Sequence, residues 1–121
     1  MNAGYTGHER IDQRSIALHR AIAEKIEADP TLLSIARDNL DRWALAAQIP
    51  LNDAGRSRPY ADAWREILDR PLPELLHLLT EDSERMRALR QATPFAGVLN
   101  PAERWAIYEL FPPSGKSAGL L

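Results

Sequence analysis

Residues 89–105 read LRQATPFAGVLNPAERW and decide how the second half of this chain folds. Both ends of the stretch have helical spacing, but Pro94 and Gly97 exclude one continuous helix through its centre. Phe95 and Leu99 are nevertheless too apolar for a loop surrounded by water. We therefore expect a connector that packs on the core, with these two side chains filling the gap between a preceding helix and a following one.

Start signals for helices stand on both sides of this connector. After it, Asn100 and Glu103 have the spacing of a capping box, with Pro101 at the first helical position. That helix is predicted to bury Trp105, Tyr108 and Leu110 or Phe111. The preceding helix is expected to begin at Ser83 or Asp82 and to bury Met86 and Leu89.

Four further helices are expected upstream. An apolar stripe predicts the first, from residue 11 to about residue 28: Ile11, Ser15, Leu18, Ile22 and Ile26. Asp29 and Pro30 end that helix and begin the next one. The second helix is predicted to bury Leu33, Ala36, Leu40, Trp43, Ala44 and Ala47. After a loop over 50–59, shorter helices are expected over 60–68 and 72–79.

No segment alternates apolar and polar residues as a strand would, and Val98 is the only valine. The fold class is therefore predicted as all-α, a single compact bundle of five to six helices with no sheet. Residues 1–10 are expected to form a flexible N-terminal arm, 11–111 the helical domain and 112–121 a flexible C-terminal tail. At least two of the three tryptophans are expected to be buried: Trp43, Trp64 and Trp105.

The composition narrows the classes of function. A chain of 121 residues with a formal net charge of -2 suits one globular domain with no general attraction for nucleic acid. The absence of cysteine excludes disulfides, thiolate nucleophiles and cysteine-ligated zinc. Neither a secretory signal nor an apolar run of about 18 residues is present, so a cytoplasmic location without membrane insertion is expected.

No constellation of catalytic residues is evident. The histidines, His8, His19 and His77, stand in separate elements without metal-ligand spacing, and neither a serine elbow nor a phosphate-binding loop occurs. The protein is therefore predicted to have no enzymatic activity, metal or cofactor. One alternative stays open, because Arg14 and His19 have the Arg-x4-His spacing that resembles HEPN-type ribonucleases. That resemblance would make these two residues the catalytic pair.

The helix before the connector could serve either of two binding functions. With Arg87, Arg90 and Gln91 exposed, it would be the recognition helix of a DNA-binding regulator, although the acidic residues at its start disfavour phosphate contacts. Alternatively, the arginines and the apolar connector form a protein-docking surface, since arginine and aromatic side chains are frequent at such surfaces. The partner-binding residues are then predicted to be Arg85, Arg87, Arg90, Gln91, Pro94 and Phe95.

Across residues 11–111, SIALHRAIAEKI and LTEDSERMRALRQATPFAGVLNPAERWAIYE resemble short bacterial proteins that are the antitoxin or accessory partner in toxin–antitoxin-type modules. The likeness is general and transfers no functional residue. It implies a non-enzymatic helical protein that binds and regulates a protein partner, such as a toxin encoded by an adjacent gene. DNA binding and self-association remain open alternatives.

Overall fold

The computed structural model describes residues 7–46 and 58–111. Over these ranges the chain forms helices and no strand: α1 (Gly7–Ala28), the short 3-10 helix η1 (Pro30–Leu32), α2 (Leu33–Ala46), α3 (Arg58–Leu68), α4 (Leu72–Leu79), α5 (Glu84–Gln91) and α6 (Pro101–Leu110). The predicted all-α fold without a sheet is thus confirmed. The expected tail over 112–121 and most of the loop over 50–59 lie outside the described residues.

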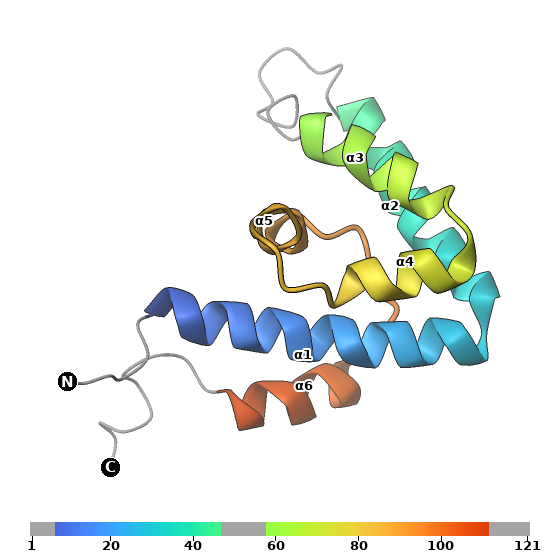
Figure 1. The fold of residues 1–121 in the computed structure, drawn as a ribbon. Coiled ribbons are helices and arrows are strands. Elements are labelled where there is room, and N and C mark those ends of the chain that lie inside the picture. Colours follow the sequence, from blue (N-terminus) through green and yellow to red (C-terminus); the bar gives the residue numbers. More distant parts are fainter. Residues whose placement is uncertain (1–6, 47–57, 112–121) are drawn as a thin grey trace.

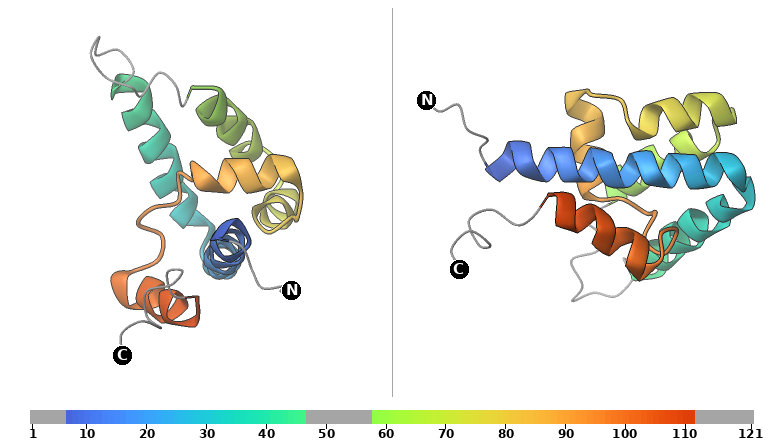
Figure 2. Two further views of the ribbon diagram at one scale, coloured as in Figure 1. Left: turned by 90° about the vertical axis from the view of Figure 1, so that its left-hand side faces the viewer. Right: turned by 90° about the horizontal axis from the view of Figure 1, so that it is seen from below.

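The long helix α1 is the central element of the bundle. Figures 1 and 2 show α4 and α5 on one side of α1 and α6 on the other. α2 and α3 form a pair that extends away from the C-terminal end of α1. Contacts join α1 to α4, α5 and α6, and join α2 to α3. The connector after α5 passes along this assembly and places α6 antiparallel to α1 (Figure 1).

The helix starts follow the capping residues that the sequence predicts. The Asp29 carboxylate accepts a hydrogen bond from the Thr31 backbone N–H, 3.2 Å, at the start of η1. Ser83 Oγ accepts from the Met86 backbone N–H, 3.2 Å, at the start of α5. At α6, Asn100 and Glu103 form the predicted capping box, with both reciprocal bonds present. Each cap satisfies a backbone donor that the first helical turn leaves free.

The first helix begins earlier than the sequence analysis predicts. α1 starts at Gly7, so residues 7–10 belong to it rather than to a flexible arm. Residues such as Glu9 and Arg10 have high helix propensity, and no proline stops the helix from extending in this direction. In α2, Ala36 and Leu40 are buried as predicted, but Ala44 is exposed.

The tryptophans differ widely in exposure. Trp64 is fully buried, and Trp43 is partly buried against the core. Trp105, in contrast, has 63% of its surface exposed, so the prediction that α6 buries this residue is wrong. α6 instead packs on α1 through Ile107 and Leu99 at its base, which turns Trp105 towards solvent.

The connector packs on the core, as its composition predicts. Phe95, Val98 and Leu99 are all at most 5% exposed, and they belong to the same apolar cluster as Trp64 and Ile26. The Phe95 ring meets Trp64 edge to face, with 5.5 Å between the ring centroids. The apolar connector is therefore part of the core, although it has no regular secondary structure.

Gly97 allows the connector to turn, and its replacement should be costly. Its φ of 102° lies where side chains with a Cβ are strained. We expect Gly97→Ala to lower the free energy of unfolding by about 1–3 kcal/mol through this backbone strain. A steric clash does not contribute, because the added Cβ would meet Ile35 Cγ2 at an ordinary 3.5 Å. Urea unfolding measures the effect, and Ala96→Ser is the control at an adjacent exposed position. A Gly97→Ala protein as stable as the control would contradict this account.

Candidate protein-binding surface

The six residues predicted to bind a partner do not form one surface. Arg85, Arg87 and Gln91 are exposed on α5, but the other three are not: Arg90 is 2% exposed, Phe95 is 1% exposed and Pro94 is fully buried. The prediction that Arg90 is exposed is therefore wrong. Of the docking surface predicted from the sequence, only Arg85, Arg87 and Gln91 on α5 are exposed.

Arg90 is buried because its side chain completes the end of α4. Its Nη1 donates hydrogen bonds to the backbone oxygens of Leu79, 3.2 Å, and Glu81, 2.9 Å. These carbonyls at the C-terminal end of a helix carry partial negative charge that a guanidinium stabilises. Burial lowers the pKa of Arg90, while Asp12 and Asp82 oppose that shift. Within the described residues, its Nη2 is buried without a hydrogen-bond partner.

His19 belongs to a buried hydrogen-bonded chain that joins α1 to the connector. Its Nδ1 lies 2.7 Å from the Ser15 carbonyl oxygen, so this nitrogen must be the donor. Its Nε2 then accepts from Thr93 Oγ1 at 2.9 Å, and that hydroxyl accepts from the Phe95 N–H at 3.2 Å. The chain of bonds therefore fixes the tautomer of His19 with its proton on Nδ1.

Burial lowers the pKa of His19 to about 4; the bond to Ser15 opposes this shift, and the charge of Arg90 adds to it. His19 is thus neutral near pH 7. It is 2% exposed, and both ring nitrogens are already bonded. Arg14 points elsewhere, with its guanidinium 5.3 Å from the centre of the Tyr108 ring. This arrangement gives no support to the alternative in which Arg14 and His19 act on RNA.

The DNA-binding alternative also finds little support in the geometry. It requires an exposed basic face on α5, but the burial of Arg90 interrupts that face. Arg87 is paired with Asp82, with Nη2 2.8 Å from Oδ1. A second acidic residue, Glu84, stands in the first turn of α5, where phosphates would need a free helix end.

Two polar side chains, Asn39 and Lys25, form hydrogen bonds that hold the connector in place. Asn39 on α2 is buried, and its Nδ2 donates to the backbone oxygens of Pro94, 2.6 Å, and Ala96, 3.0 Å. Its Oδ1 in turn accepts from Arg42. On α1, Lys25 Nζ donates to the Val98 carbonyl oxygen at 3.0 Å. No sequence pattern marks either residue, since their acceptors are backbone atoms far along the chain.

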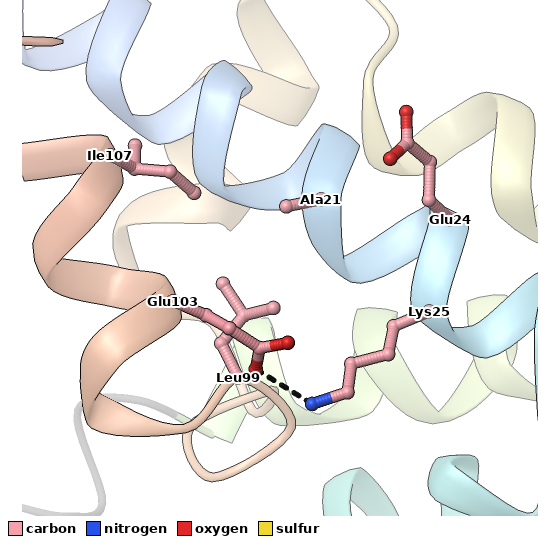
Figure 3. Close-up of a pocket in the computed structure, with 6 residues that line it drawn as sticks. All are labelled: Ala21, Glu24, Lys25, Leu99, Glu103 and Ile107. Atoms are coloured by element: carbon pink, nitrogen blue, oxygen red, sulfur yellow. Dashed lines mark hydrogen bonds and ion pairs between the residues drawn. The ribbon is translucent and has the colours of Figure 1, made fainter.

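Lys25 also holds the start of α6. Its Nζ lies 2.7 Å from Glu103 Oε1, and Figure 3 shows this pair beside the shallow groove between α1 and α6. The groove, of about 390 Å³, is lined by Ala21, Glu24, Lys25, Leu99, Glu103 and Ile107. The hydrogen bond from Lys25 lowers the pKa of Glu103, and the bond to Asn100 adds to the effect. One carboxylate thus serves both the capping box and the contact with α1.

The side of α6 that faces away from α1 is exposed and is apolar except for one acidic residue. It carries Ala102, Trp105, Ala106, Glu109 and Leu110, which share one helical face by their spacing and which we call the α6 outer face. Trp105 is 63% exposed and Leu110 is 74% exposed. The Trp105 ring rests edge to face on Tyr108, with 6.1 Å between centroids. Because Trp105 had been assigned to the core, sequence reasoning missed this surface.

Other classes of site are not evident in the part of the chain that the structure describes. There, His, Asp and Glu side chains do not gather in groups of three or more that could hold a metal ion. The same part contains no helix with the length and apolar character needed to cross a membrane. Comparison with known proteins finds no family model, no curated protein and no solved structure that matches this chain.

Proposed function

We propose that this protein is a non-enzymatic interaction protein that binds and regulates a protein partner, and that the α6 outer face is its binding surface. The observation that carries the proposal is the exposure of Trp105 and Leu110 on one helical face. Tryptophan is among the residues that contribute most binding energy at protein interfaces. Large apolar side chains that gather on one exposed face, rather than being scattered singly, are typical of a protein-interaction site.

The way α6 is held supports the same proposal. The capping box, the Lys25–Glu103 pair and the contacts of Lys25 and Asn39 with the connector fix where the helix starts. A surface whose backbone is already ordered loses less entropy on binding than a flexible one. The outer face is thus presented in a defined orientation, as a docking surface requires.

The resemblance in the sequence suggests the kind of partner. A toxin encoded by an adjacent gene is the first candidate, and binding in the cytoplasm would neutralise it. The α5 edge formed by Arg85, Arg87 and Gln91 lies on a different helix and is the competing location for the interface.

Replacement of Trp105 should weaken partner binding by more than tenfold, since truncating a central interface tryptophan costs about 2 kcal/mol or more. The tagged full chain is co-expressed with the product of the adjacent gene, and the affinity of the purified pair is measured by calorimetry. Leu45→Ala is the matched control, because Leu45 is 65% exposed on α2. We expect that control to bind as the unchanged protein does.

Two outcomes would contradict the proposal. If Trp105→Ala binds the partner as tightly as Leu45→Ala, the α6 outer face is not the interface. If instead Arg85→Ala with Arg87→Ala abolishes binding and Trp105→Ala does not, the interface lies on α5, as the sequence analysis predicts. Circular dichroism of each variant checks that the fold is retained.

A further inference from the structure

We propose that residues 112–121 of the same chain fold back along the α6 outer face and occupy it in the absence of a partner. This inference uses the proposed function only for its consequence, namely that the segment competes with the partner for one surface. Its basis is the chemistry of the face, the chemistry of the segment and the distance between them.

The α6 outer face is complementary to a segment that is apolar and carries one basic group. Trp105 and Leu110 flank it, and Ala102 and Ala106 leave room for a close approach between them. Glu109 lies in the middle of this face, and among the side chains that the structure describes, over 12–46 and 60–111, no basic group forms an ion pair with it. An apolar surface around one acidic group favours a segment that carries one base among apolar residues.

The segment that follows α6 has this composition. Residues 112–121 read PPSGKSAGLL, with Lys116 as the one charged side chain and Leu120 and Leu121 as the large apolar ones. The Pro-Pro and Ser-Gly pairs at its start are typical of turns and not of a continuing helix. A reversal of direction at residues 112–115 would aim the remaining residues back along α6.

The lengths agree with this course. Residues 115–120 in extended form span roughly 17 Å, and a helix of ten residues such as α6 is roughly 15 Å long. Lys116, at the start of the run, then lies level with Glu109 near the end of α6. Leu120 lies level with the first turn of α6, which the Trp105 ring covers because helical side chains lean towards the N-terminus.

A second copy of the protein fits the α6 outer face less well than the segment does. Two such faces packed together would place the Glu109 side chains of both copies in one apolar interface without a base to pair with them. Like charges brought together in this way are unfavourable. Lys116 supplies the opposite charge within the same chain, so the segment is the better occupant.

A spin label on the segment tests the proposal in the full chain without any partner. The chain has no cysteine, so Ala118→Cys accepts a nitroxide at a single position. If the segment folds back, the label lies beside the first turns of α6, and the NMR signals of Ala102 and Trp105 should broaden more than that of Leu110. A free segment would give the reverse order, with the strongest broadening near its attachment at Leu110 and a decline towards Ala102.

Charge variants test the pairing of Lys116 with Glu109. Lys116→Glu in the labelled protein should lower the ratio of molecules with the segment folded back to molecules with it free. The expected decrease is up to roughly fivefold, which corresponds to the loss of one exposed ion pair. Lys116→Glu combined with Glu109→Lys should restore it, and Ser114→Glu is the control for added negative charge outside the run. The proposal is overturned if the unchanged segment gives the order expected of a free segment, or if the charge swap fails to restore the broadening of Trp105.

The two proposals can fail separately. The broadening experiment contains no partner, so its failure leaves the effect of Trp105→Ala on partner affinity as it was measured. Conversely, if Trp105→Ala leaves the partner affinity unchanged, the position of the spin label measured without a partner still stands. If both proposals hold, Lys116→Glu should raise partner affinity by the factor by which it raises the fraction of molecules whose segment is free.

Discussion

Trp64→Ala should lower the free energy of unfolding by about 3–5 kcal/mol, the range for truncating a buried tryptophan. The side chain of Trp64 is fully buried, and its ring packs edge to face on Phe95. Its Nε1 donates to the Leu89 carbonyl oxygen at 3.1 Å, so the substitution also removes a buried hydrogen bond to α5, although this oxygen still accepts from the Ala92 N–H at 3.0 Å. The loss is a large part of the roughly 5–15 kcal/mol that stabilises a natural domain.

Urea unfolding monitored by circular dichroism measures this loss. Trp105→Ala removes the same atoms from a position that is 63% exposed, and we expect it to change the free energy of unfolding by less than about 0.5 kcal/mol. Trp64→Phe keeps a ring against Phe95 but removes the N–H donor, so it should fall between the two. Equal losses for Trp64→Ala and Trp105→Ala would refute the division between core and surface described above.

Acidification should destabilise the protein through His19. Its pKa is about 4 in the folded state against the ordinary histidine value of 6.5, so the unfolded chain binds a proton more readily. Stability therefore falls as the pH drops below 6.5, and the loss from this residue levels off below pH 4. From pH 7 to pH 5 the expected loss is about 2 kcal/mol, and the full loss is about 3 kcal/mol.

The pH window separates His19 from the carboxylates. The pKa values of Glu66 and Glu103 lie below the ordinary glutamate value of 4.5, because hydrogen bonds from Arg70 and Lys25 favour their charged forms. Their stabilising contributions are therefore lost only as the pH falls below this value. Urea unfolding from pH 7 to pH 5 should show the histidine effect in the unchanged protein and in His77→Gln, but not in His19→Gln. An unchanged slope in His19→Gln would show that another group is responsible.

Local signals in the sequence were sufficient to predict where most of the helices start. Ser83, Asn100 and Glu103 cap their helices as predicted, because a capping bond joins residues two or three positions apart and needs no knowledge of the remaining fold. The burial of Phe95 followed in the same way from its apolar neighbours and from the breaks at Pro94 and Gly97. The single all-α assembly could therefore be predicted from local patterns and composition alone.

The candidate binding surface could not be predicted in this way. Arg90 is buried because α4 ends beside α5 and presents backbone oxygens to it, which is a tertiary arrangement that no pattern within α5 encodes. Trp105 is exposed because Lys25 holds Glu103 and so fixes which side of α6 meets α1. In both cases the rotation of a helix was set by a partner on another element, outside the helix's own sequence pattern.

The contacts that hold the connector and α6 also bear on the order of folding. His19–Thr93, Lys25–Val98, Lys25–Glu103 and Asn39–Pro94 join positions that are 74, 73, 78 and 55 residues apart. Contacts of such separation close large loops, so they form after the local helix pairs that reduce the entropy of closure. α6, with no fully buried residue of its own, should then dock last during folding and detach first when the native state opens locally. The helix that carries Trp105 would be the part of the fold whose amide hydrogens exchange with solvent most readily.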